Sequence, residues 1–187
     1  MARFIAYQGG SAGMKSRGFT LLELMVALVV LGIAVSIAVP SFSSLIDRQR
    51  IDSSLDVLLR GLRTARQEAI ERNRPITVAP PAGGWSVGWR VFIDDNANGS
   101  YDDGERLLRE ELQPTPINIH AASSIANYVR FNPQGESELL NGGFQAGTFR
   151  FCPQDESSKG RLLVMNRVGR LRTASDVIDP SYCSADG

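Results

Sequence analysis

Hydrophobic and polar positions change abruptly near the start of the chain, between residues 18 and 19. From residue 19 to residue 39 every position except Glu23 is uncharged, and most are Leu, Val, Ile or Ala. At about 1.5 Å per residue, a helix of this length extends roughly 30 Å, which is the thickness of the hydrocarbon core of a bilayer. The pattern therefore predicts a membrane-spanning helix.

The residues before the apolar run give the predicted helix an orientation. Three basic residues and no acidic residue precede it: Arg3, Lys15 and Arg17. By the positive-inside rule, the N-terminus stays cytoplasmic and the bulk of the chain is exported. No Ala-x-Ala-like site follows the run, so the helix is expected to be kept. Met1 and Met14 both stay open as the start of translation.

Beyond residue 40 the helical pattern continues with a single apolar face. Apolar side chains recur three or four residues apart, at Ile51, Leu55, Leu58, Leu62, Ala65 and Ala69. This spacing lines them along one side of a helix that ends at Pro75, and that side is expected to pack on a sheet. Charges of both signs cover the rest of the helix, which indicates a solvated surface.

From Ile76 onward, short runs of β-branched and aromatic residues alternate with Gly, Pro and Asn. The predicted strands that follow are 85–93, 106–111, 117–120, 128–131, 147–151, 161–165 and 170–173. One long helix followed by an antiparallel sheet is an α+β fold. With 187 residues and 43% hydrophobic content, there is room for one modest domain after the apolar helix.

The junction at residues 18–23, Gly-Phe-Thr-Leu-Leu-Glu, resembles the cleavage and assembly signature of type IV pilins and type II secretion pseudopilins. The resemblance implies that a prepilin peptidase cleaves after Gly18 and methylates Phe19. It also implies that Glu23 pairs with the N-terminal amine of a neighbouring subunit, which offsets the cost of a carboxylate in apolar surroundings. Pro40 stands where this family often has a proline, and it is expected to kink or loosen the helix.

Two further segments, Gly88–Asp94 and Phe131–Gly135, are similar to the GspH/FimT group of minor pilins and minor pseudopilins. The implied organisation is a leader at 1–18, a transmembrane and assembly helix at 19–46, and a periplasmic head at 47–187 that includes the second half of the helix. The implied location is the bacterial inner membrane and then a pilus or pseudopilus filament. The implied partners are other pilin subunits and the prepilin peptidase.

Residues 94–105, the acidic loop, match the spacing of a calcium-binding loop. Oxygen-bearing side chains fall at its odd-numbered positions and at its twelfth position: Asp94, Asn96, Asn98, Asp102 and Glu105. However, predicted strands flank the loop where a helix–loop–helix site needs helices, and Asp, Asn and Gly also suit a hairpin turn. Two interpretations stay open, a calcium site or a structural turn, and neither makes a cofactor a requirement.

The chain has two cysteines, Cys152 and Cys183, both in the part expected to face an oxidising periplasm. Metal binding needs more ligands than these and His120 supply, so a disulfide is the simpler inference. Closing a loop of some thirty residues stabilises a fold by about 3 to 4 kcal/mol in the loop-entropy model. We therefore expect the disulfide to clamp the C-terminal segment.

Basic residues gather near the C-terminus of a chain with 20 basic and 20 acidic residues. The overall balance gives no general attraction to an anion, so any such binding must come from a local patch. Between residues 148 and 173 six basic residues stand against Asp155 and Glu156: Arg150, Lys159, Arg161, Arg167, Arg170 and Arg172.

On a strand, the side chains of Arg170 and Arg172 leave the same face about 6 to 7 Å apart, and guanidinium groups suit phosphate oxygens. The sequence at 169–172, Gly-Arg-Leu-Arg, resembles the Gly-Arg-x-Arg motif associated with DNA capture by FimT-type minor pilins in natural transformation. The residues expected to bind double-stranded DNA are Arg170 and Arg172, helped by Arg167, Arg161 and Lys159. The alternative is that these arginines are solvated, or pair with Asp176, Asp179 or a neighbouring subunit.

An enzyme is not expected, because the chain has a single histidine and no pairing of nucleophile and base, phosphate-binding glycine loop or zinc-ligand spacing. Two functions stay open. One is a minor pilin or pseudopilin at a filament tip, with a basic patch that binds DNA for uptake. The other is a purely structural minor pseudopilin of type II secretion, which primes assembly and does not bind DNA.

Overall fold

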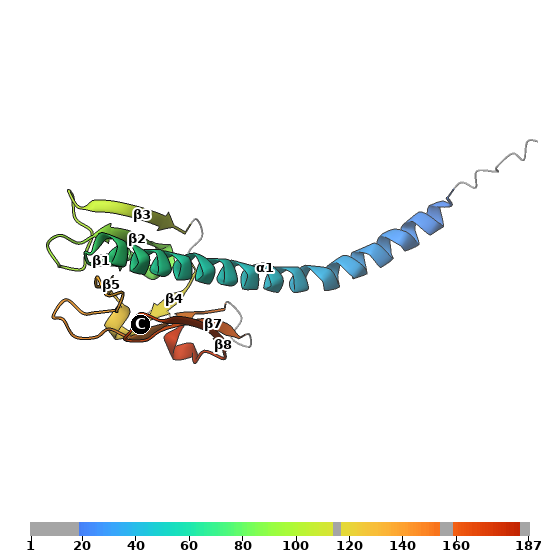
Figure 1. Ribbon diagram of the computed structural model, residues 1–187. Coiled ribbons are helices and arrows are strands. Elements are labelled where there is room, and N and C mark those ends of the chain that lie inside the picture. The colour runs from blue at the N-terminus through green and yellow to red at the C-terminus, as the bar shows by residue number, and fades with distance from the viewer. Residues whose placement is uncertain (1–18, 114–116, 154–158, 184–187) are drawn as a thin grey trace, which may run out of the picture. The chain divides into compact units, whose positions relative to one another are not determined.

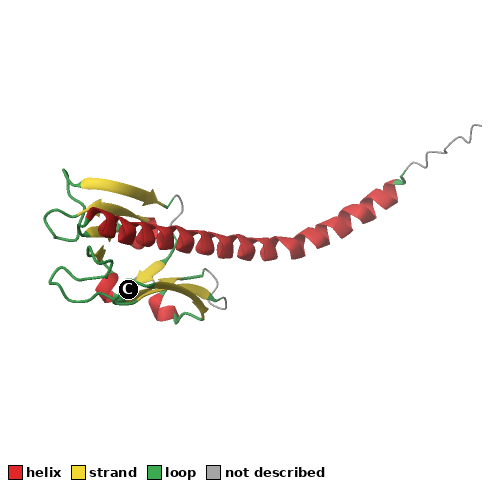
Figure 2. Ribbon diagram, viewed as in Figure 1, coloured by secondary structure: helices red, strands yellow, loops and turns green. Residues whose placement is uncertain are grey.

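The computed structural model describes residues 19–113, 117–153 and 159–183, and the side chains of residues 37–44 also lie outside the description. In the described part, one long helix, α1 (Leu21–Arg72), precedes all the strands and three short 3-10 turns (Figures 1 and 2). The arrangement confirms the predicted α+β class. The chain divides into two compact units, one ending at Phe42 and the other beginning at Ser43.

Both ends of α1 have recognisable capping residues. At the start, the Thr20 hydroxyl accepts a hydrogen bond from the Glu23 backbone N–H at 3.2 Å, which satisfies one of the unpaired donors of the first turn. At the end, Asn73 adopts a left-handed backbone (φ 51°), and the Arg74 N–H bonds to the Ala69 carbonyl at 3.2 Å. Such an ending is common, and it agrees with the predicted stop at Pro75.

In the first unit, the large apolar side chains of α1 between Leu21 and Val35 are 49 to 77% exposed. Among the residues described, no helix combines the length and the apolar character that a membrane crossing requires. The predicted span extends to residues 37–39, whose side chains lie outside the description together with that of Pro40. The span and the kink therefore stay predictions.

In the second unit the strands form two antiparallel, four-stranded sheets. The first has the order β3-β2-β1-β5 and consists of β1 (Ile76–Ala79), β2 (Gly88–Ile93), β3 (Arg106–Leu112) and β5 (Val129–Phe131). The second has the order β4-β6-β7-β8 and consists of β4 (Ile119–Ala121), β6 (Gly147–Phe151), β7 (Gly160–Met165) and β8 (Leu171–Asp176). The 3-10 turns are η1 (Trp85–Val87), η2 (Ser123–Ile125) and η3 (Pro180–Tyr182).

The strands divide between two antiparallel sheets, because the chain changes sheets three times between β3 and β6. Strand β4 pairs with β6, with Ile119 opposite Phe151, whereas β5 returns to β1, with Val129 opposite Val78. The predicted strand at 85–93 also begins as the turn η1, and its strand starts at Gly88. A local pattern can locate a strand, but only the distant partner decides which sheet the strand joins.

One hydrophobic core joins the second half of α1 to both sheets. All six residues of the predicted apolar helix face are at most 6% exposed, which confirms that face. Opposite them lie buried aromatic residues of both sheets, among them Trp89, Phe131 and Phe149. Figure 1 shows the labelled strands β3 and β8 on opposite sides of this half of the helix. The hairpin β7–β8 is therefore mounted on a packed scaffold.

Candidate nucleic-acid interface

The Gly-Arg-Leu-Arg motif lies where the β7–β8 hairpin turns. Met165 and Leu171 are opposite each other at the last rung of the ladder, and the chain reverses between them. The Asn166 N–H bonds to the Arg170 carbonyl at 3.1 Å, and the Arg170 N–H donates to the Asn166 side-chain oxygen at 2.9 Å. Gly169 has a left-handed backbone (φ 71°), which a three-residue hairpin loop requires at this position.

The loop after β5 holds this turn against the helix. The Ser137 hydroxyl, which is buried, lies 3.0 Å from the Asn166 carbonyl. From α1, the Arg66 Nε donates to the Gly135 carbonyl at 2.7 Å. The first contact joins the loop to the turn and the second joins the loop to α1, so the loop connects the arginine-bearing turn to the helix. The Phe131–Gly135 segment, noted for its family resemblance, thus packs directly against the motif.

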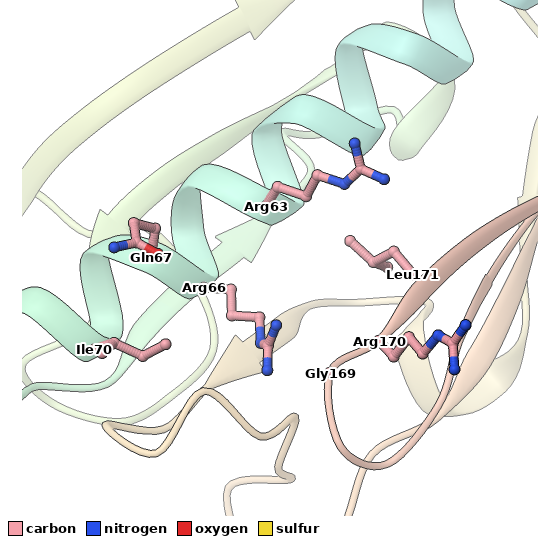
Figure 3. A pocket seen from close by; sticks show the side chains of 7 residues that line it. All are labelled: Arg63, Arg66, Gln67, Ile70, Gly169, Arg170 and Leu171. Carbon is pink, nitrogen blue, oxygen red and sulfur yellow. The ribbon is translucent and has the colours of Figure 1, made fainter.

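Three of the predicted DNA-binding residues, Arg167, Arg170 and Arg172, share this end of the hairpin and are exposed. Leu171 packs towards the core, and in Figure 3 it points at α1 while Arg170 points away. Within the described part, none of the three forms an ion pair with a carboxylate; the Arg167 guanidinium lies 6.0 Å from the Phe144 ring. The hairpin end is thus a group of exposed cations.

The other two predicted residues, Lys159 and Arg161, lie at the opposite end of the hairpin. Arg161 is opposite Ser175, three residues along β7 from the partner of Arg172, which corresponds to about 10 Å. Its guanidinium forms a two-pronged pair with Asp52 of α1, at 2.5 and 3.1 Å. The predicted alternative, pairing with an acid, therefore holds for Arg161, but the acid is Asp52 instead of Asp176 or Asp179.

A groove runs between α1 and the hairpin turn, with a volume of about 340 Å³. It is lined by Arg63, Arg66, Gln67, Ile70, Gly169, Arg170 and Leu171 (Figure 3). Arg63 and Arg66 were assigned to a solvated helix surface from the sequence, and no pattern in the sequence related them to the motif a hundred residues later. The only available signal was their position, one turn apart on the polar side of the helix.

The predicted disulfide between Cys152 and Cys183 is present. The adjoining Tyr182 ring lies 4.1 Å from the guanidinium of Arg150 and 5.1 Å from the ring of His120. The disulfide therefore ties the C-terminal turn η3 to the end of β6, and the Tyr182 ring contacts β6 and β4. Arg150, which belongs to the basic stretch in the sequence, is engaged by this aromatic contact and does not join the group at the hairpin end.

In the acidic loop, side-chain oxygens bind the backbone of the loop itself. The Asp94 carboxylate accepts hydrogen bonds from the N–H groups of Asn98 and Gly99 at 3.0 and 2.9 Å. The Glu105 carboxylate accepts from the Asp102 N–H at 3.1 Å. Amide groups of Asn96 and Asn98 donate to Asp102 and hold the pKa of that carboxyl below its ordinary value.

Among the described residues, no three acidic, histidine or cysteine side chains gather in a way that could hold a metal ion. The carboxylates of Asp94 and Glu105 are engaged in hydrogen bonds within the loop, as in a structural turn, and calcium binding by the loop stays a prediction.

Of the residues that the resemblance assigns to processing and assembly, Phe19 and Glu23 lie near the start of α1, and Pro40 lies within it. Gly18 is outside the described residues, and Phe19, which follows it, is 84% exposed. Glu23 contributes its backbone N–H to the helix cap on Thr20.

Two models of known families match the chain, one over its N-terminal part and one over its head. The prokaryotic N-terminal methylation motif matches residues 13–39. The model of a second family, type II transport protein GspH, matches residues 55–169, more than half of the chain. The chain belongs to the GspH family. Its match covers most of the packed head, up to the glycine of the hairpin turn.

Relatives come from pilus and secretion systems. The chain is 43% identical over 143 residues to the type II secretion system core protein G of Pectobacterium carotovorum subsp. carotovorum, covering 72% of each protein. It is 38% identical over 94 residues to the pilin-like protein PilA1 of Thermus thermophilus. That alignment covers 50% of this chain and 58% of PilA1, so the chain spans little more than half of that relative.

Among solved structures, the fold matches the type IV minor pilin FimU of Pseudomonas aeruginosa with a TM-score of 0.55. The match covers 75% of this chain and 99% of FimU at 21% identity. At that identity the likeness concerns the fold, which is that of a type IV pilin.

Proposed function

We propose that this member of the GspH family is a non-enzymatic minor subunit of a type IV pilus or a type II secretion pseudopilus. In this proposal a prepilin peptidase cleaves after Gly18 and methylates Phe19. The apolar half of α1 holds the subunit in the inner membrane until it enters the filament, where Glu23 meets the amine of a neighbouring subunit. The methylation motif at 13–39 and the exposed apolar side chains of α1 support this sequence of events.

We further propose that the head lies at the filament tip and captures double-stranded DNA through the hairpin end. The observation that carries the proposal is the group formed by Arg167, Arg170 and Arg172, which are exposed and lack carboxylate partners in the described part. Guanidinium groups of this kind bind phosphate oxygens without selecting a base. Arg161 is left out of the proposed contact because Asp52 already occupies its guanidinium.

Fluorescence anisotropy of a labelled duplex tests DNA capture, with the full chain kept in a non-ionic detergent. Replacing Arg170 and Arg172 by Ala removes two proposed phosphate contacts, so the slope of log affinity against log salt should become shallower by about 1.8. Arg161→Ala removes the same kind of charge from the same hairpin and should leave that slope unchanged. Failure of the wild-type chain to bind at low salt would contradict DNA capture.

The second candidate function is a purely structural pseudopilin of type II secretion. It is favoured by the 43% identity, over 72% of the chain, to the secretion system core protein G. In that case the arginines contact acidic surfaces of neighbouring subunits. Deleting the gene would then abolish secretion of folded proteins without affecting DNA uptake, and the Arg170→Ala/Arg172→Ala variant would fail to restore secretion.

A further inference from the structure

The cationic surface of the hairpin continues onto α1. Arg63 and Arg66 line the same groove as Arg170, and they lie one helical turn apart, where side chains are neighbours on the helix surface. No acidic residue is among the described residues that line this groove. Two acids follow Arg66 on the helix: Glu68 forms an ion pair with Arg72, and Glu71 accepts a hydrogen bond from Gln67 at 2.8 Å.

The arginines of the groove retain unused donors. Within the described part, neither Arg63 nor Arg66 forms an ion pair with a carboxylate. Arg66 uses its Nε for the Gly135 carbonyl, and this bond holds the guanidinium at the base of the turn. Arg63 is exposed. With Arg170, they line one groove with cations from two elements distant in sequence.

The directions of the side chains indicate the shape of the anion. In Figure 3 the guanidinium groups of Arg63, Arg66 and Arg170 stand apart from one another and do not point at a common centre. A compact anion needs donors that point at one centre, as in a two-pronged arginine clamp. An extended chain of phosphates instead meets successive cations along its length.

We propose that Arg63 and Arg66 belong to one phosphodiester-binding surface with Arg170 and Arg172, so that nucleic acid lies across the groove between α1 and the hairpin. This inference rests on the DNA capture proposed above and adds the helix to it. Arg63 contacts the phosphate backbone directly. Arg66 does so with its terminal nitrogens, while its Nε keeps the turn in place.

The test uses Arg63→Ala, because this side chain is exposed and has no described partner whose loss would unfold the head. The control is Arg106→Ala on β3, the outer strand of the other sheet, which removes the same charge from an exposed position. Each full-length variant is titrated with duplex DNA by anisotropy at several salt concentrations, and circular dichroism confirms its fold.

Arg63→Ala should make the salt slope shallower by about 0.9, which weakens binding about eightfold at 0.1 M salt if affinities converge at 1 M. Arg63→Lys, which keeps the charge, should restore most of the slope. Arg106→Ala should behave as wild type.

The inference is overturned if Arg63→Ala behaves like Arg106→Ala while Arg170→Ala/Arg172→Ala still weakens binding. In that outcome DNA capture by the hairpin survives. A wild-type chain that binds no duplex would overturn the proposed DNA capture and the inference together.

Discussion

Gly169, the glycine of the Gly-Arg-Leu-Arg motif, has no room for a side chain. A Cβ built on it would lie 2.5 Å from the Gly135 carbonyl oxygen, 3.2 Å from Arg66 Nε and 3.3 Å from the Phe131 ring. Its backbone is also left-handed (φ 71°), a conformation that residues with a side chain adopt at a cost. We predict that Gly169→Ala forces the turn away from the helix.

The cost has two parts. The left-handed backbone costs an alanine about 1 to 2 kcal/mol. Relieving the contact with the Gly135 oxygen separates that carbonyl from Arg66, and a hydrogen bond to a charged donor contributes about 1.5 to 3 kcal/mol. Because the Arg66–Gly135 bond is only partly buried, the lower part of that range applies, and we expect a total loss of about 2 to 4 kcal/mol.

A matched control separates the two parts. Gly142 is also left-handed (φ 81°), but a Cβ there would meet no atom within 4 Å. Gly142→Ala therefore carries the backbone cost alone, about 1 to 2 kcal/mol. Guanidinium denaturation of both variants, followed by circular dichroism, gives the two free energies of unfolding. Equal losses in the two variants would refute the close packing of the turn against Gly135.

Three further predictions concern the C-terminal turn and the acidic loop. Replacing Cys152 and Cys183, which are 31 residues apart, by Ser should lower the free energy of unfolding by about 3 to 4 kcal/mol. Chemical denaturation of the oxidised wild type and of the variant measures this difference. A loss below about 1 kcal/mol would contradict the loop-entropy account. Hydrogen bonds from the backbone and side chain of Ser181 lower the pKa of Asp179, so its stabilising effect should be complete above about pH 3.9 and disappear as the pH falls through the folded-state value. NMR titration of that carboxyl should give a midpoint below 3.9, and a midpoint at or above it would be inconsistent with the cap. Millimolar calcium should leave the melting temperature unchanged, because hydrogen bonds within the acidic loop already engage its side-chain oxygens. A rise in the melting temperature would contradict this prediction and support calcium binding by the loop.

Residue patterns that extend over a few positions made the helix and most strands predictable. The apolar residues of α1 recur at helical spacing, and all six are buried. The strand at Gly147–Phe151 begins and ends where the alternation of residue types indicated. The disulfide was also predictable, because two cysteines allow a single pairing. Each of these features depends on residue type and spacing, which the chain carries locally.

Pairings of long range were not predictable in the same way. Arg161 looked like a member of the basic patch, but Asp52, on another element, neutralises it. Arg63 looked like an ordinary helix surface residue, but the hairpin turn lies across the groove from it. In both cases the role of a charge depends on which distant group stands opposite.

The sequence by itself determined the class of this protein, its long helix and buried helix face, most of its strands and its disulfide, because hydrophobic periodicity, capping residues and processing motifs act over a few residues at a time. Only the tertiary structure decided that the strands form two sheets. It also decided that Arg161 pairs with Asp52, whereas Arg63, Arg66 and Arg170 line the groove between α1 and the hairpin without an ion pair among the described residues. The physical reason is that packing and charge compensation depend on contacts across the core, and residues far apart in the chain make those contacts.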